Sequence, residues 1–285
     1  MEREIFKVRG KFLLQFARNK LAMVGLVIIG MLALVAVFAP YLAPEGYNAM
    51  DLARVQQGPT GDCPLGTDEF GRSVLSRIIW GCRISLGAGV VVLLIGGTLG
   101  SLLGLTAGYF GQTVDQVISR IVDILLTFPY ILIAIAIVSI LGQGLQQTMI
   151  AVGLSYVPRF ARLIRGYVIS IRELEYVEAI RALGGSHLRI IFRHILPNCL
   201  SAVLVYGTLA MGMAILAESA LSFLGLGIQP PMPSWGVMIA TGKEYIRTSP
   251  HMSLFPGLCI TITVMGFNFF GDGLRDFLDP KFRRD

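Results

Sequence analysis

Charged side chains are scarce in this sequence. Asp, Glu, Lys and Arg make up only 15% of its 285 residues, whereas soluble domains carry about a quarter. Apolar residues account for 54%, and the mean hydropathy is +0.69. Since a soluble core does not need this much apolar surface, the composition predicts a polytopic helical membrane protein.

Signals for metal binding and catalysis are also lacking. The four cysteines do not have the spacing of a zinc site, so we predict no metal and no cofactor on this chain. The three histidines lie outside the long apolar runs, and no run contains a Ser–His pair or two nearby carboxylates. An enzyme buried in the membrane is therefore not expected. Cys63 and Cys82 fall in one predicted outer segment, where two isolated thiols are favoured over a disulfide and the pairing stays open.

Two further absences concern the source of energy. The phosphate-binding pattern Gly-x-x-x-x-Gly-Lys-Ser/Thr is missing, because neither Gly10-Lys11 nor Gly242-Lys243 is followed by Ser or Thr. Ionisable residues such as Arg120, Asp123 and Glu218 fall near the edges of apolar runs, and we place none at a midplane, where ion-coupled carriers need them. The chain is thus expected neither to hydrolyse ATP nor to couple to an ion. This indicates a gated pathway moved by a separate protein.

Long apolar runs are what the sequence has in abundance. Each is long enough to cross a hydrocarbon core of about 30 Å at about 1.5 Å per residue. We predict an all-α fold with six membrane-spanning helices, at residues 21–43, 84–109, 121–141, 148–168, 199–217 and 252–270. Basic residues cluster at both chain ends and between Arg159 and Arg193. These regions are therefore placed in the cytoplasm.

This topology divides the chain into segments. Residues 1–20 form a cytoplasmic segment with a short helix along the membrane surface, and residues 276–285 form a cytoplasmic tail. Residues 44–82 form an outer loop with a short amphipathic helix, and residues 83–275 form the core domain. Within that domain, residues 172–197 form a cytoplasmic helix-turn-helix and residues 218–251 an outer loop.

Glycines recur at every fourth residue of the second span: Gly96, Gly100, Gly104 and Gly108. They reduce one face of that helix to backbone, so it must touch another helix closely, in this chain or in a partner. Phe128-Pro129 predicts a kink in the third span. The fourth span gives a weaker signal, because Pro158 and three arginines fall in its second half.

The charged stretch from Glu175 to Asn198 interrupts the apolar runs. We predict a helix over 172–183, ended by Gly184-Gly185, with Ser186 capping the helix that follows. The second helix is expected to show four apolar side chains on one face and to end or kink at Pro197. The four are Leu188, Ile191, Phe192 and Ile195. The result is a compact helical corner with an apolar side and a basic side.

The outer segment from Cys63 to Leu86 also carries a helix pattern. Thr67 is a plausible N-cap, and the carboxylates of Asp68 and Glu69 suit the positive end of the helix that follows. Its apolar stripe would contain Phe70, Val74 and Ile78. Asp68 and Arg72 are spaced to form an i, i+4 pair.

The charged stretch carries a resemblance to a known family. Glu178-Ala179-Ile180, Gly184 and Ile195-Leu196-Pro197 resemble the "EAA loop" of permease subunits of binding-protein-dependent ABC importers. Ile180 and His194 depart from the family's usual alanine and isoleucine. In that family the loop contacts a separate ATPase, so the resemblance implies that role for Glu178, Ala179, Arg181, Gly184, Arg189, Leu196 and Pro197.

Three other stretches resemble the dipeptide, oligopeptide and nickel branch of these importers, and its second permease in particular. In the outer segment the matching residues are Gly66, Thr67, Asp68, Gly71, Arg72, Arg77 and Arg83, with Cys63 where the branch commonly has histidine. The outer loop at residues 218–236 and the C-terminal stretch at residues 271–280 also match. Together the resemblance covers about residues 16–283.

The resemblance implies a function. This chain would pair with a homologous permease, two ATPases that hold ATP and magnesium, and an external binding protein, in a bacterial or archaeal plasma membrane. It would pass small peptides by alternating access, without nucleic acid as a partner. Nickel or another small solute is an alternative cargo, and an ATP-independent carrier or channel is the rival class.

Overall fold

The computed structural model describes residues 19–278, and within them every regular element is helical. The predicted all-α fold is therefore confirmed. The predicted surface helix within residues 1–20 and most of the predicted tail lie outside the described residues. The elements along the chain are α2 (Lys20–Val37), α3 (Ala39–Leu42), η1 (Leu52–Arg54), α4 (Val74–Val92), η2 (Leu93–Gly97), α5 (Thr98–Phe110), α6 (Gln112–Leu126), α7 (Tyr130–Leu141), α8 (Leu145–Arg172), α9 (Glu175–Ala182), α10 (His187–Ile190), η3 (Ile191–Ile195), α11 (Leu196–Phe223), α12 (Trp235–Gly242), η4 (Lys243–Tyr245) and α13 (His251–Leu278).

Four helical stretches are long and apolar enough to cross a membrane: residues 20–37, 74–110, 187–223 and 251–278. The pair α6 and α7 makes a fifth if it counts as one broken span. The predicted kink at Phe128-Pro129 is correct in position but is a complete break, with a 92° angle between the two helices. Proline has no N–H to donate and disfavours helix in the residue before it. The predicted fourth span, α8, is not among those that meet this test.

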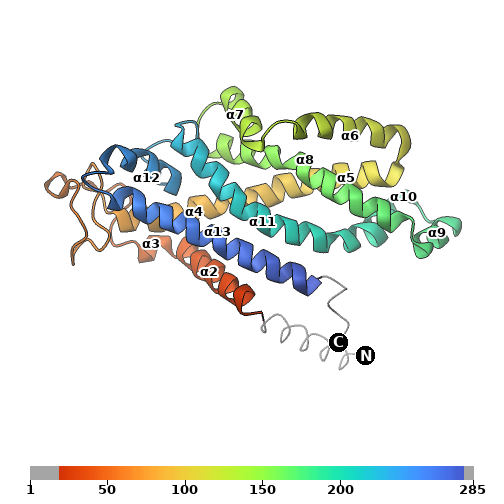
Figure 1. Cartoon of the computed structure of the whole chain (residues 1–285), viewed down its shortest axis with the longest axis horizontal. Coiled ribbons are helices and arrows are strands. Elements are labelled where there is room, and N and C mark those ends of the chain that lie inside the picture. The colour runs from red at the N-terminus through yellow and green to blue at the C-terminus, as the bar shows by residue number, and fades with distance from the viewer. Residues whose placement is uncertain (1–18, 279–285) are drawn as a thin grey trace.

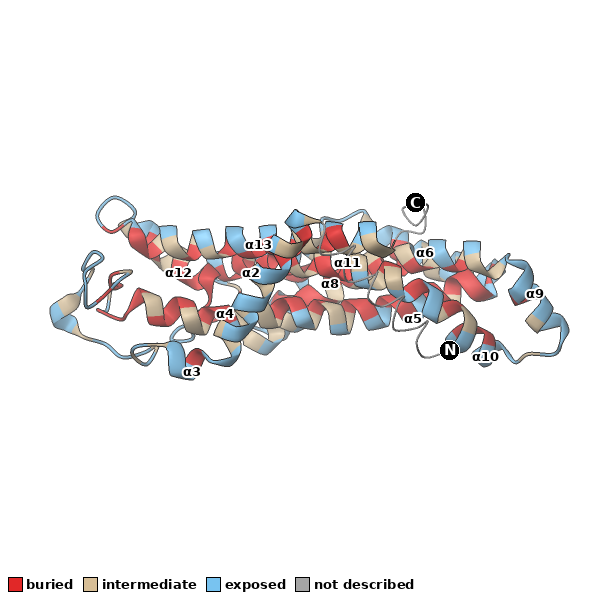
Figure 2. Cartoon of the chain, turned by 90° about the horizontal axis from the view of Figure 1, so that it is seen from below, coloured by how far each residue is buried: buried red, intermediate tan, exposed pale blue. Residues whose placement is uncertain are grey.

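The long helices form an elongated bundle (Figure 1). α2 lies along α13 and α4, α11 lies between α13, α4 and α8, and α5 pairs with α8. α12 packs against α13 and α11 at one end, while α9 and α10 project from the opposite end (Figure 1). Buried residues follow the middle of the bundle, and α9 is largely exposed (Figure 2).

α5 and η2 lie closely against α8 along the four glycines that recur at every fourth residue. A Cβ on Gly96 would lie 3.0 Å from the Gly153 carbonyl oxygen, and one on Gly104 would lie 2.6 Å from that of Ala161. Gly100 faces Val157, Phe160 and Ala161, and Gly108 faces Arg165 and Val168. We call this contact the glycine seam. It lies within this chain, and it fixes α8, which carries four arginines, directly on α5.

Gly104→Ala is expected to destabilise the bundle, because the new methyl group meets backbone atoms of α8 that cannot rotate away. Overpacking of this kind costs about 1–3 kcal/mol. The matched control is Gly166→Ala on α8, where a Cβ meets nothing within 4 Å. Thermal unfolding in detergent should show a lower midpoint for Gly104→Ala alone, and equal midpoints for both variants would contradict the seam.

Candidate functional site: a knob and a cap at opposite ends of the bundle

Residues 173–195, which we call the knob, connect α8 to α11. The predicted helix over 172–183 begins later than expected. α8 continues to Arg172, the chain turns at residues 173–174, and α9 begins at Glu175 with Leu174 as its N-cap. Leu174 offers no side-chain cap, but Glu175 and Glu178 place negative charge in the first turn, which the helix dipole favours.

A Schellman motif ends α9. The Gly185 N–H donates to the Ile180 carbonyl and the Gly184 N–H to the Arg181 carbonyl, each at 3.0 Å. Gly184 takes a φ of +78°, which residues with a Cβ rarely adopt. The helix therefore ends directly before Gly184-Gly185, as predicted.

The second half of the knob differs from the prediction. Ile191–Ile195 is a π-helical turn, which adds a residue per turn and shifts the buried face. Ile190, Ile191 and Ile195 are buried, whereas Leu188 and Phe192 are exposed. Ser186 precedes α10 but makes no side-chain cap bond, so its predicted capping role was wrong.

Of the two effects predicted for Pro197, an end or a kink, the structure does not show the end. Pro197 lies in the first turn of α11, and the helix continues through it to Phe223. The His194 carbonyl accepts hydrogen bonds from the Asn198 amide at 2.6 Å and from the Tyr176 hydroxyl at 3.3 Å, and the amide also donates to that hydroxyl at 3.2 Å. Tyr176 belongs to α9 and Asn198 to α11. These three hydrogen bonds, which we call the clamp, join the knob to α11.

The base of the knob is fastened to α5 and α8 as well. The Tyr109 hydroxyl lies 2.8 Å from Nδ1 of His187, and the Arg181 guanidinium lies over the Tyr109 ring at 5.8 Å. Arg172 donates to the Gly108 carbonyl at 2.8 Å. Buried Val177 and Ile190 share one core cluster with α5, α8 and α11. The knob is therefore joined to the end of each of these helices.

The residues that the family resemblance selected lie on the surface of the knob and in the first turn of α11. Glu178, Ala179, Arg181, Gly184, Arg189 and Pro197 are exposed, and Leu196 is half-buried. Sequence reasoning missed two apolar neighbours, Leu183 at 87% and Leu188 at 69% exposure. Their position beside the glycine corner was the signal that could have found them.

Gly184→Ala is expected to loosen the end of α9. A Cβ there meets nothing within 4 Å, so the cost is purely conformational, roughly 1–2 kcal/mol for the left-handed backbone. Hydrogen exchange at the Gly185 amide should accelerate about 5- to 30-fold. Gly184→Asn, which tolerates that backbone, should show a smaller change, and unchanged exchange in both variants would contradict this account.

At the other end, residues 43–73 form what we call the cap, and its structure departs from the predicted amphipathic helix. α4 begins only at Val74, with Ser73 as its N-cap, and Thr67 pairs with Ser73 across a tight loop. Phe70 is exposed, not part of an apolar stripe. Gly71, at φ +70° and against Asp51, stops a helix from forming earlier.

The loop is held by a buried ion cluster. Asp68 accepts from Arg72 at 2.6 Å and lies 3.4 Å from Arg77, and both guanidiniums are almost fully buried. Arg72 also pairs with Glu69 at 2.8 Å, where burial, and next the Asp68 charge, raises the pKa of the Glu69 carboxyl. The predicted Asp68–Arg72 pair is thus present, but in a folded loop and not along a helix.

The other residues singled out in this part of the sequence lie in the cap and on α4. The Thr67 hydroxyl accepts from the Gln57 N–H at 3.0 Å, and its carbonyl lies 3.0 Å from Nε2 of His251. A Cβ on Gly66 would lie 2.7 Å from the His251 ring, which explains the glycine. Cys63 and Cys82 are free thiols. Arg83 is exposed on α4, away from the cluster.

Asp68→Asn is expected to destabilise the cap strongly, because it leaves two buried guanidiniums without their shared carboxylate. Breaking a buried pair from one side costs about 3–5 kcal/mol. Limited proteolysis should then cleave residues 43–73 much faster. Asp62→Asn, on an exposed part of the same cap, should leave the rate unchanged, and a matching increase there would contradict the cluster's role.

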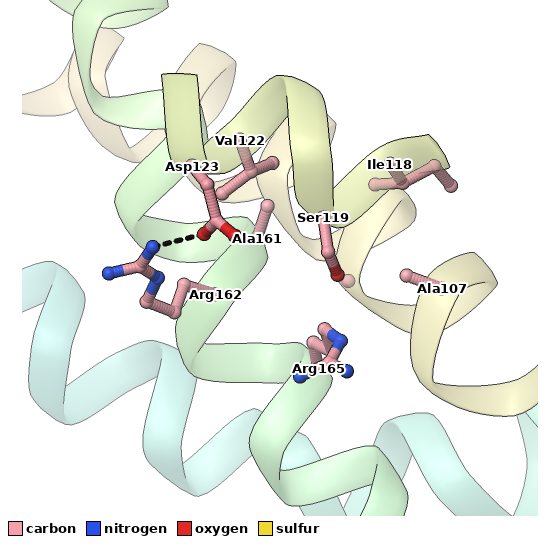
Figure 3. A pocket seen from close by; sticks show the side chains of 9 residues that line it. Ala107, Ile118, Ser119, Val122, Asp123, Ala161, Arg162 and Arg165 are labelled. Carbon is pink, nitrogen blue, oxygen red and sulfur yellow. Dashed lines mark hydrogen bonds and ion pairs between the residues drawn. The ribbon is translucent and has the colours of Figure 1, made fainter. Parts of the chain in front are cut away.

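Two ion pairs join α6 to α8 around a cavity of about 150 Å³ (Figure 3). Arg165 donates to Asp115 at 2.6 Å, and Arg162 pairs with Asp123. The pairing of Asp123 with Arg162 was not predicted from the sequence, because it depends on how the chain turns at Gly111 between α5 and α6. In the described part of the chain, no three His, Cys, Asp or Glu side chains gather as metal ligands.

Comparison with known proteins identifies the family. Residues 100–284 match the family described as the inner membrane component of binding-protein-dependent transport systems. The chain belongs to this family of transport permeases. Residues 10–59 also match the N-terminal transmembrane domain of oligopeptide transport permease C. The first match contains the knob, and the two matches together confirm the resemblance to the second permease of the dipeptide, oligopeptide and nickel branch.

Relatives of this permease are similar over nearly its whole length. It is 48% identical to the dipeptide transport system permease protein DppC of Alkalihalophilus pseudofirmus, over 99% of this chain and 90% of that protein. It is 43% identical to the glutathione transport system permease protein GsiD of Pectobacterium atrosepticum, over 96% and 91%. The fold resembles an inward-facing structure of the MetNI methionine ABC transporter, with a TM-score of 0.55, 20% identity, and coverage of 72% of this chain and 96% of that one.

Proposed function

We propose that this permease forms, with a homologous partner permease, the pathway of an ABC importer for short peptides. Peptide is proposed as the cargo because this chain is similar to permeases named for a dipeptide and for glutathione, itself a small peptide. Nickel or another small solute is an alternative that no feature of the described residues favours. The ATP-independent carrier loses its support, because the family is that of binding-protein-dependent transport.

The knob is proposed as the contact with the ATPase subunits. It carries an exposed mixed surface of Leu183, Leu188, Arg181 and Arg189 on a corner fixed by the Schellman motif. Exposed leucines on a rigid corner suit a protein partner, since a water-exposed loop gains nothing from them. ATP and magnesium would be bound by those partners, outside this chain.

The orientation follows from this role. The knob end would lie in the cytoplasm, where ATP is, with both chain termini on that side. The cap would face outward, where a substrate-loaded binding protein docks. The excess of arginine over acidic residues between Arg159 and Arg193 supports the same orientation. The cell membrane would be that of a bacterium or archaeon.

Motion would pass from the ATPase through the knob into three helices. The clamp joins α9 to α11, His187 joins α10 to α5, and Arg172 joins the end of α8 to the end of α5. When ATP closes the ATPases, the knob would move these helix ends together. The pathway would then open outward and reset after hydrolysis, which is alternating access.

The experiment is co-purification of the importer from detergent-solubilised membrane, with wild type beside Glu178→Ala and Gly184→Trp. Both variants change exposed residues of the knob, so the bundle should fold normally. We expect the ATPases to co-purify with wild type, and either to be lost or to hydrolyse ATP without peptide uptake in the variants. Gly58→Trp, on the exposed cap surface, is the control and should retain the ATPases.

If the ATPases never associate with wild type, or if both knob variants behave as wild type, the knob is not the coupling element. Uptake by this permease without any ATPase would instead support a self-contained carrier. Uptake of nickel but not of a dipeptide would retain the importer and replace the cargo.

A further inference from the structure

One arginine of α8 differs from the others. Arg162, Arg165 and Arg172 each form an ion pair with an acidic side chain. Arg159 lies at the middle of the 28-residue helix, is half-buried, and takes part in none of the ion pairs within 4.0 Å found in residues 19–278. The sequence pattern placed Arg159 in the second half of the predicted fourth span, together with Arg162 and Arg165.

Tyrosines from three helices surround this guanidinium. It lies 4.5 Å from the ring centroid of Tyr130 and 5.5 Å from that of Tyr156, and Tyr206 is a hydrogen-bond partner. The rings of Tyr130 and Tyr156 are themselves 5.3 Å apart. A guanidinium above aromatic rings keeps N–H donors free at its edge. Arg159 therefore retains the fork that suits a planar anion.

A buried hydroxyl in the same cluster lacks a partner. Tyr156 is only 1% exposed, and its hydroxyl makes no hydrogen bond within 3.5 Å, interacting with Tyr130 only at longer range. A buried polar group without a partner destabilises a protein, unless a ligand or water supplies the bond. The cluster thus offers both a positive charge and an unused donor.

The backbone is also interrupted at this place. Tyr130 is the first residue of α7, directly after the break at residues 127–129 where the chain turns by 92°. Irregular backbone at membrane depth is tolerated where it is buried in protein or lines a water-filled cavity. An ionisable side chain beside such a break, in none of the ion pairs of residues 19–278, is by default a candidate site for a polar solute.

We propose that Arg159 binds the carboxylate of a short peptide in transit, with the hydroxyls of Tyr130, Tyr156 and Tyr206 as further donors. The proposal rests on peptide import as the proposed function. A guanidinium binds a carboxylate through two parallel N–H bonds. Every linear peptide has this group at its C-terminus whatever its sequence, so such a site selects the class of cargo and not a single peptide.

The test uses the complete importer, purified with its partner permease, ATPases and binding protein, and trapped with ATP and vanadate. Retention of the radiolabelled dipeptide Ala-Phe is compared with that of its C-terminal amide. Wild type should bind Ala-Phe about 10- to 100-fold more tightly than the amide, as expected for a charge-assisted hydrogen bond. Arg159→Gln should bind both equally weakly, while still showing ATP hydrolysis stimulated by the loaded binding protein.

Arg162→Gln is the matched control, because Arg162 lies one turn further along α8 and pairs with Asp123. It should keep the preference for the free carboxylate. Where Arg159→Gln does not assemble, Arg159→Lys and Tyr156→Phe take its place. Each should reduce the preference, since lysine lacks the fork and phenylalanine lacks the hydroxyl.

The proposal is overturned if Arg159→Gln, or both replacement variants, prefer Ala-Phe over its amide as strongly as wild type does. So does an equal loss of both peptides together with loss of stimulated ATP hydrolysis, which indicates a structural role. Import of Ala-Phe without preference for the carboxylate rejects the site but leaves peptide import standing. Failure of wild type to retain or import either peptide rejects both.

Discussion

The backbone contact between α5 and α8 is the constraint on which the rest of the structure depends. Four glycines, one per helical turn, bring the two helices close enough for added methyl groups to meet backbone. That approach sets the end of α5 beside the end of α8, so that Arg172 reaches the Gly108 carbonyl and Tyr109 reaches His187. A knob attached to one helix alone would pivot, but this one is fastened to α5, α8 and α11.

The arginines of α8 show how one helix serves several purposes. Arg162 and Arg165 hold α6 in place through Asp123 and Asp115. Arg172 joins the end of α8 to the end of α5, and Arg159 lies among tyrosines beside the break between α6 and α7. At the opposite end, Asp68 joins two buried arginines of the cap and the start of α4. Charge is scarce in this permease. The buried Arg72 and Arg77 are paired with Asp68, whereas the half-buried Arg159 takes part in none of the ion pairs of residues 19–278, and the proposed site uses this difference.

Sequence patterns predicted the features that depend on local chemistry. The stop at Gly184-Gly185 and the glycine spacing of α5 follow from backbone geometry, and the break at Phe128-Pro129 from the missing proline N–H. Features that depend on contacts between residues far apart in the sequence were not predicted. Thr67 was taken for a helix cap, but buried pairing of Asp68 with Arg72 and Arg77 folds that loop instead. The π-helical turn at Ile191–Ile195 rotated the buried face, and no local residue type announces it.

The central claim is that the knob and the α5–α8 pair move as one body during the ATP cycle. Leu183 on the knob and Leu102 on α5 are both exposed and can carry spin labels. Double electron–electron resonance then measures the distance between the two labels in the assembled importer. The account predicts the same distance distribution without nucleotide and with ATP and vanadate, while the distance from Leu183 to the partner permease changes. A shifted or broadened distance between Leu183 and Leu102 would contradict it, because the knob would then bend away from the helices it is meant to move.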